Sequence, residues 1–188
     1  SWQNGGEMET NGLELALGLN PTSLIDLGGL DWNMHMTYYT NESEVTKLTV
    51  DPYNYGGFAT FLGTYRIEEG VSPTAIVGAD YDADGNHIEL GNENPDFRLS
   101  FRNSLSFGPL SLSFLIDHKE GGHAINLANL IYDLGATTAD YEENGSRTAV
   151  LGGGSTAPYV ESTTYTALRD LSLTYSLPAG LTEGYGLS

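Results

Sequence analysis

A strict two-residue alternation between apolar and polar side chains runs through residues 96–118 and limits the fold of this chain more than any other feature. Between 97 and 107 the odd positions hold mainly Leu and Phe, whereas the even positions hold only Ser and Arg. Gly108-Pro109 interrupts the pattern, which resumes with apolar even positions from 110 to 116. Successive side chains of a β-strand point to opposite faces, so the pattern predicts two strands, each with one apolar and one polar face. The Gly-Pro pair predicts a tight turn between them.

The length of the first of these strands favours a membrane barrel. It has about 11 residues, which is about twice the length of an ordinary strand in a globular protein. At roughly 3.3 Å per residue and a tilt near 45°, it spans about 25 Å, the height of the apolar band of an outer-membrane β-barrel. There the apolar face contacts lipid and the polar face contacts a wet lumen. A soluble β-sandwich, whose core would hold the same apolar face, also alternates, so alternation alone leaves both architectures open.

Three further segments show the same pattern, which gives five expected strands near residues 7–19, 31–39, 96–107, 110–118 and 164–177. A weaker alternation continues the second strand through Val45, Lys47 and Thr49. The connections alternate between short and long, and the long ones cover residues 40–95 and 119–163. We therefore expect an all-β antiparallel meander of long strands that forms an open, partial segment of a transmembrane β-barrel with two long extracellular loops. Helical spacing of apolar residues predicts one short helix within Ala124–Leu134, ended by Gly135.

Charge and composition exclude several classes of protein. The formal net charge is -18, with only seven basic residues among 188. Because nucleic-acid binding needs a basic surface, this function is excluded. The acidic residues concentrate between the expected strands, where they keep exposed loops soluble. The chain has no cysteine, which excludes disulfides and Cys-ligated zinc. No apolar run reaches the length of a membrane helix, so strands would make any contact with a bilayer.

An acidic stretch between the second and third expected strands resembles the start of a calcium-binding loop. Asp80, Asp82 and Asp84 alternate, and a glycine and Asn86 follow. Carboxylates at alternating positions let a chain wrap around a hard cation. The twelfth position is Gly91, where such a loop has Glu. The four oxygen-bearing residues are thus candidate calcium ligands, and an acidic surface turn is the alternative.

The polar face of the central hairpin carries Arg98 and Arg102, with Asp117 across the turn. These three residues are candidates to face the lumen, where they would contact a substrate or a plug. The alternative is a structural ladder of ion pairs between neighbouring strands. The sequence has no G-x-S-x-G motif or other nucleophile arrangement, so we expect no catalysis. It identifies no substrate-binding residue.

Four stretches follow one another in a specific order: residues 6–15; residues 92–97 with the strand, Gly108-Pro109 and residues 112–115; residues 120–127; and residues 159–178. Together they resemble the late, C-terminal part of the barrel of SusC/RagA-type TonB-dependent outer-membrane transporters. The order and spacing agree over nearly the whole chain. The barrel of this family has about 22 strands. We therefore expect this chain to be a fragment that lacks the plug, the TonB box and the final strand.

The resemblance implies a transporter in the outer membrane of a Gram-negative bacterium that imports large nutrients, glycans or peptides, into the periplasm. It implies a SusD-like surface lipoprotein as a partner, outer-membrane lipid around the barrel, and the TonB–ExbB–ExbD complex as energy source through the missing N-terminal part. It implies no cofactor; calcium is suggested only by the acidic loop. The alternative from another class is a secreted, soluble β-rich carbohydrate-binding module with a calcium loop. That module would bury the Leu and Phe face of residues 97–107 between two sheets.

Overall fold

The computed structural model describes residues 5–178, and the chain divides into two compact units. Unit 1 takes residues 1–12, 40–96 and 120–164, and unit 2 takes residues 13–39, 97–119 and 165–188. Both units are therefore assembled from three separate stretches of the chain. Unit 2 holds most of the long strands, and unit 1 holds the two long segments that connect them.

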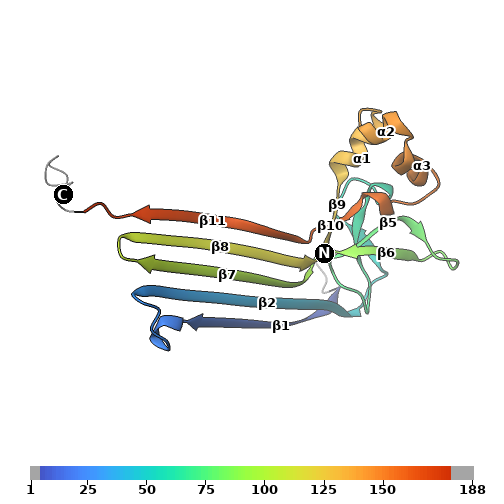
Figure 1. Ribbon diagram of the computed structural model, residues 1–188. Helices are drawn as coiled ribbons and strands as arrows, with labels where there is room; N and C mark the ends of the chain where they lie inside the picture. Colours follow the sequence, from blue (N-terminus) through green and yellow to red (C-terminus); the bar gives the residue numbers. More distant parts are fainter. Residues whose placement is uncertain (1–4, 179–188) are drawn as a thin grey trace, which may run out of the picture. The chain divides into compact units, whose positions relative to one another are not determined.

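A five-stranded antiparallel sheet is built from the long strands. These are β1 (Gly6–Leu19), β2 (Leu30–Leu48), β7 (Pro95–Phe107), β8 (Leu110–Gly121) and β11 (Tyr165–Tyr175). They lie side by side in the order β1-β2-β7-β8-β11 (Figure 1). The expected antiparallel meander of five long strands is confirmed. Among the described strands the sheet does not close into a barrel, since β1 and β11 are its two edges.

Local sequence signals set the ends of these strands. Asn20 ends β1, and its side-chain Oδ1 accepts a hydrogen bond of 3.0 Å from the backbone N–H of Ser23, in the 3-10 turn η1 (Pro21–Ser23). Gly108 has a φ of 56° in the turn between β7 and β8, a conformation that glycine adopts without steric cost. β2 continues to Leu48, nine residues beyond the strand expected at 31–39, which agrees with the weaker continuation that the sequence indicated through Val45 and Lys47.

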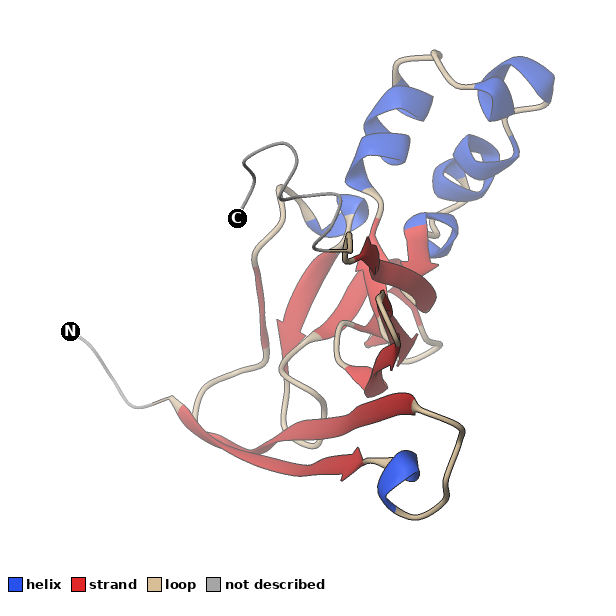
Figure 2. Ribbon diagram, turned by 60° about the vertical axis from the view of Figure 1, so that its left-hand side comes forward, coloured by secondary structure: helices blue, strands red, loops and turns tan. Residues whose placement is uncertain are grey.

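The long segments are not irregular loops, because they fold into unit 1. The segment between β2 and β7 forms a four-stranded antiparallel sheet. Its strands are β3 (Tyr53–Tyr55), β4 (Thr64–Ile67), β5 (Ala75–Tyr81) and β6 (His87–Asn92), and it also contains the 3-10 turn η2 (Thr60–Leu62). The segment between β8 and β11 forms β9 (His123–Ile125), which pairs with β10 (Val160–Ser162). It also contains the 3-10 turn η3 (Ala157–Tyr159) and three helices. The helices are α1 (Leu127–Leu134), α2 (Ala139–Glu143) and α3 (Ser146–Gly152), which are grouped together in Figure 2. The short helix expected before Gly135 is confirmed as α1.

The core of unit 1 lies around β5. Ala75 and Ile76 are fully buried, and Val77 is 2% exposed. The next residue, Gly78, allows Thr156 to approach closely, since a Cβ at Gly78 would lie 2.4 Å from the Thr156 side chain. The Thr156 hydroxyl accepts a hydrogen bond from the backbone N–H of Ala79 at 2.8 Å and donates one to the carbonyl oxygen of Phe61 at 3.0 Å. Thr156 therefore ties the two long segments of unit 1 together.

A buried carboxylate joins the helices of unit 1. Asp133 of α1 is fully buried, and its two oxygens accept hydrogen bonds of 2.7 and 2.9 Å from the guanidinium of Arg147 in α3. The Tyr159 hydroxyl donates to the same carboxylate at 2.9 Å, and the Thr138 hydroxyl donates to it as well. The hydrogen bonds from Arg147 hold the pKa of Asp133 well below its usual range, against the effect of burial. Burial, and then the Asp133 carboxylate, raise the pKa of Tyr159 to about 12.

We predict that Asp133→Asn destabilises unit 1 by about 3–5 kcal/mol, because it leaves the Arg147 guanidinium without its buried counter-charge. Chemical denaturation followed by far-ultraviolet circular dichroism at the helix band measures this, since the α-helices of the described residues all lie in unit 1. Glu143→Gln, which removes a carboxylate from an exposed position of α2, is the matched control. It should change the free energy of unfolding by less than about 0.5 kcal/mol. Equal effects of the two changes would contradict a structural role for the buried network.

The same network predicts a pH dependence. Because the pKa of Asp133 is lower in the folded protein than in the unfolded chain, the stabilisation it gives is fully present above the unfolded pKa of about 3.9. It is lost as the pH falls from there through the lower folded-state value. The difference in unfolding free energy between the natural chain and Asp133→Asn should therefore shrink on acidification below about pH 4. A difference that stays constant between neutral pH and about pH 2 would contradict this assignment.

Candidate functional site

The two faces of the sheet in unit 2 differ in chemistry, and together they form the candidate site. Register and side-chain contacts place one side chain of every two on a common apolar face: odd positions 13–19 of β1, even positions 32–38 of β2, odd positions 97–107 of β7, even positions 110–116 of β8, and Leu168, Leu171, Leu173 and Tyr175 of β11. Met36 pairs with Phe101, for example, and Leu173 pairs with Leu112. We call this set of residues the apolar face. The remaining residues of the same strand segments form the polar face.

The apolar face is not covered within unit 2. Phe107 is 58% exposed, Leu171 is 62% exposed and Leu173 is 68% exposed. The fully buried apolar side chains of the described residues all belong to unit 1, so unit 2 has no apolar core of its own. Phe101 and Leu112, at the centre of the face, are partly exposed. Unit 2 is therefore a single layer of strands with one uncovered apolar surface.

A β-bulge preserves the apolar face along β11. Leu168 pairs with Ile116 and Asp170 pairs with Leu115, so Arg169 is one extra residue between them. In a regular strand without a bulge, Leu168 and Leu171, three positions apart, would point to opposite faces. The bulge places both leucines on the apolar face and directs Arg169 toward the carboxylate of Asp117.

One polar pair interrupts the apolar face. Asn103 of β7 is 2% exposed, and its Oδ1 accepts a hydrogen bond of 3.0 Å from the indole N–H of Trp32 on β2. Its Nδ2 has no hydrogen-bond partner among residues 5–178. The surrounding apolar side chains shield the amide, so the face remains apolar at its surface.

The polar face carries hydroxyl and charged groups that bond across the strands. Thr37 and Ser100 share a hydrogen bond between β2 and β7, and the Ser106 and Ser111 hydroxyls lie 2.9 Å apart across the turn. Arg98, Arg102 and Asp117 share this face, as their positions in the sequence predicted. That it lines a lumen stays a prediction.

The charged partners on the polar face differ in part from the expected ladder. Asp117 accepts hydrogen bonds from the Tyr165 hydroxyl at 2.7 Å and from Arg169 Nε at 3.2 Å, both on β11. Arg102 lies 4.0 Å from Asp170, and both side chains are about half exposed. Sequence reasoning missed Arg169 because the bulge takes it out of the two-residue pattern. The signal that could have found it is the three-residue spacing between Leu168 and Leu171.

The candidate calcium ligands lie at and beside the turn between β5 and β6. Asp82 uses its carboxylate within this turn, where it accepts hydrogen bonds from the backbone N–H groups of Asp84 at 2.9 Å and Asn86 at 2.8 Å. The bond from the Asn86 backbone is the main reason that the pKa of Asp82 is lowered. Asp80 points elsewhere, since its Oδ2 accepts a hydrogen bond of 2.8 Å from the backbone N–H of Thr156. In the described part of the chain, no three Asp, Glu, His or Cys side chains form a group that could hold a metal ion. Calcium binding stays a prediction.

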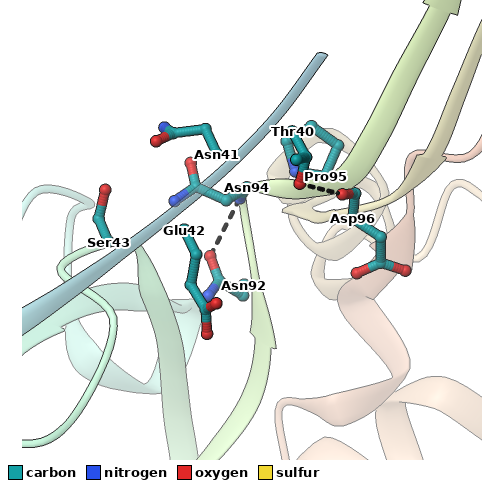
Figure 3. Close-up of a pocket in the computed structure, with 8 residues that line it drawn as sticks. All are labelled: Thr40, Asn41, Glu42, Ser43, Asn92, Asn94, Pro95 and Asp96. Carbon is teal, nitrogen blue, oxygen red and sulfur yellow. Dashed lines mark hydrogen bonds between the residues drawn. The ribbon is translucent and has the colours of Figure 1, made fainter. Parts of the chain in front are cut away.

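A polar concavity of about 340 Å³ lies in unit 1, where residues 40–43 of β2 lie beside the junction of β6 and β7 (Figure 3). Eight residues line it: Thr40, Asn41, Glu42, Ser43, Asn92, Asn94, Pro95 and Asp96. The Thr40 hydroxyl donates to the carbonyl oxygen of Asp96 at 2.8 Å, and the backbone N–H of Asn94 donates to Asn92 Oδ1 at 3.0 Å. The lining offers amides, hydroxyls and carboxylates but no cation and no aromatic ring. It suits hydroxyl or amine groups better than anions.

No family model matches the chain, and no curated protein matches it. No helix among residues 5–178 has both the length and the hydropathy needed to cross a membrane.

We predict that deletion of Arg169 destabilises the sheet no more than Arg169→Ala does. In the deletion variant Leu168 and Leu171 are two positions apart, so regular alternation keeps both on the apolar face without a bulge. Both variants lose the half-exposed ion pair with Asp117 and the cation–π contact with Tyr165, together on the order of 1 kcal/mol.

Deletion of Ser172 is the contrast, because it turns Leu173 and Tyr175 to the polar face or breaks their pairing with β8, at a cost of about 1 kcal/mol each. Urea unfolding of the chain in detergent micelles, followed by tryptophan fluorescence, measures the three variants. Equal losses from the two deletions would contradict the assigned bulge.

Proposed function

We propose that this chain is a section of the barrel wall of a SusC/RagA-type TonB-dependent transporter in the outer membrane of a Gram-negative bacterium. The observation that carries the proposal is the single-layer sheet of unit 2, with an uncovered apolar face on one side and a polar face on the other. A barrel wall needs this combination, because one face contacts lipid and the other contacts water or cargo. In this role the chain binds and guides cargo and catalyses no reaction.

The amount of exposed apolar surface supports contact with lipid. About ten large apolar side chains of the apolar face are between 44% and 68% exposed, including four leucines of β1 and three of β11. Moving a half-exposed leucine from water into hydrocarbon gains on the order of 1 kcal/mol. Ten such side chains give on the order of 10 kcal/mol, which is comparable to the whole stability of an ordinary domain of 5–15 kcal/mol. A face of this size is rarely left in water.

The dimensions of the apolar face also fit a bilayer. On β7 the face runs from Phe97 to Phe107, and at about 3.3 Å per residue with a tilt near 45° it covers roughly 25 Å. Tyr38 lies at one end of the face, and Phe107 and Tyr175 lie at the other. Aromatic residues at both ends match the girdles that flank the lipid band of outer-membrane barrels.

The connections divide into the two kinds that outer-membrane barrels have. Residues 20–29 and the Gly108-Pro109 turn are short and would face the periplasm, where barrel turns are short. The two long connections fold into unit 1 and would form the extracellular part. Unit 1 also holds 19 of the 25 acidic residues, which fits a part of the protein that stays in water.

The cargo and the protein partners are supported by the resemblance of the sequence motifs. On that basis, the transporter imports a glycan or a peptide, is covered by a SusD-like lipoprotein and is energised by TonB–ExbB–ExbD. The alternative of a soluble carbohydrate-binding module requires a second sheet over the Leu and Phe face, and the described residues of unit 2 form one layer only. No observation favours that alternative over the barrel wall.

We predict that neighbouring positions of β11 contact different media. Because the chain has no cysteine, a spin label can be attached to Leu171→Cys on the apolar face or to Ser172→Cys on the polar face, the matched control. In lipid vesicles, oxygen should relax the label at 171 more strongly, and a water-soluble nickel complex should relax the label at 172 more strongly. A label at 171 that neither reagent reaches would show a sealed core and contradict the barrel wall.

A further inference from the structure

The cations of this acidic chain are distributed unevenly. Unit 1 contains three of the seven Lys and Arg residues, and unit 2 contains the other four, Arg98, Arg102, Lys119 and Arg169. The register places all four on the polar face of the sheet, across β7, β8 and β11. The formal charge is therefore -16 in unit 1 and -2 in unit 2. Within unit 2, the positive groups concentrate on one face of three adjacent strands.

Two of these four cations have little or no pairing. Lys119 is only 9% exposed and has a partner, and Arg169 is bonded to Asp117. The Arg102 side chain lies 4.0 Å from a half-exposed carboxylate, which is at the outer limit of an ion pair and contributes little. Arg98 is exposed, and its side chain forms no salt bridge or hydrogen bond within residues 5–178, although its charge contributes to the lowered pKa of Asp117. Arg98 and Arg102 therefore keep guanidinium donors that can bind a ligand.

We propose that Arg98 and Arg102 form a binding site for carboxylate groups of the transported cargo. A guanidinium presents a planar fork of N–H donors that matches a carboxylate with two parallel hydrogen bonds. The two arginines are four residues apart on the same face of β7, which corresponds to about 13 Å between their Cα atoms. This spacing suits an extended ligand that carries a carboxylate on successive or alternate units. The Ser100 hydroxyl lies between the two arginines, and Tyr39 of β2 lies directly beside Arg98.

This inference rests on the proposed function in one respect, because the polar face must line the path of the cargo. It adds that the cargo is anionic. Nearby carboxylates reduce the local attraction, since Asp96 is two residues from Arg98 on the same face of β7 and Asp170 lies 4.0 Å from Arg102. An acidic oligosaccharide and an acidic peptide can supply the same carboxylates, so the experiment includes both.

The test is isothermal titration of the full chain in nonionic detergent micelles with two probes, trigalacturonate and triglutamate. Maltotriose and triglutamine are their uncharged counterparts. The protein variants are Arg98→Gln with Arg102→Gln, Arg98→Lys with Arg102→Lys, and Lys47→Gln. Lys47 is 58% exposed and pairs with Glu7 in unit 1, so its variant controls for loss of positive charge away from the polar face.

We expect at least one acidic probe to bind the natural chain and neither uncharged probe to do so. The double Gln variant should weaken this binding at least tenfold, the double Lys variant should weaken it less, and Lys47→Gln should leave it within twofold. Binding should also weaken when salt rises from about 0.1 M to about 1 M, because the screening length falls to about 3 Å. Binding of trigalacturonate alone identifies an acidic saccharide as the cargo class, and binding of triglutamate alone identifies an acidic peptide.

Two results would overturn the inference: neither acidic probe binds, or the double Gln variant binds as tightly as the natural chain. The spin-label measurement at Leu171 separates this failure from failure of the proposed function. If Leu171 contacts lipid but no acidic probe binds, the barrel wall stands and the carboxylate site is wrong. If an acidic probe binds through the arginines but Leu171 is sealed, the arginines bind carboxylates, but the barrel wall and the assignment of the ligand as transported cargo are wrong.

Discussion

The pleat of a β-strand sends successive side chains to opposite faces, and unit 2 depends on this constraint. Five strands keep their Leu and Phe residues on one face because the register of each pair matches the next. No second layer of described residues covers that face within unit 2. The sheet consequently relies on its surroundings for the apolar contacts that other proteins obtain from a core. The bulge at Arg169 shows how strictly the pattern is kept, since it accommodates one extra residue that would otherwise turn the following leucines to the other face.

Unit 1 is organised in a different way. It has its own core around Ala75, Ile76 and Val77. Its helices are joined by the fully buried Asp133, whose charge is balanced by Arg147. A buried ion pair of this kind gives little net stability but penalises any arrangement that separates the partners. Unit 1 therefore contains its own sources of stability, whereas the apolar face of unit 2 has no covering layer among the described residues of that unit.

The sequence predicted the elements with a strong period and missed those without one. β7 and β8 were found to within a few residues because their alternation is strict, and α1 was found from apolar residues in helical spacing closed by Gly135. The strands β3 to β6 were read as loop because they are short and are separated by glycine and proline. Asp117 was assigned to the polar face, but its partners Tyr165 and Arg169 could not be named, since they depend on the β8–β11 register and on a bulge.

The sequence by itself determined which residues share a face, because side-chain direction along a strand follows from the backbone geometry alone. It also determined that the chain is acidic, lacks cysteine and contains five long strands. Only the tertiary structure decided that the apolar face stays uncovered within its unit and that the long connections fold around a core. It also decided that Arg98 and Arg102 have weak partners or none. These properties depend on which segments lie next to one another, and contacts between distant residues are not encoded in any local pattern.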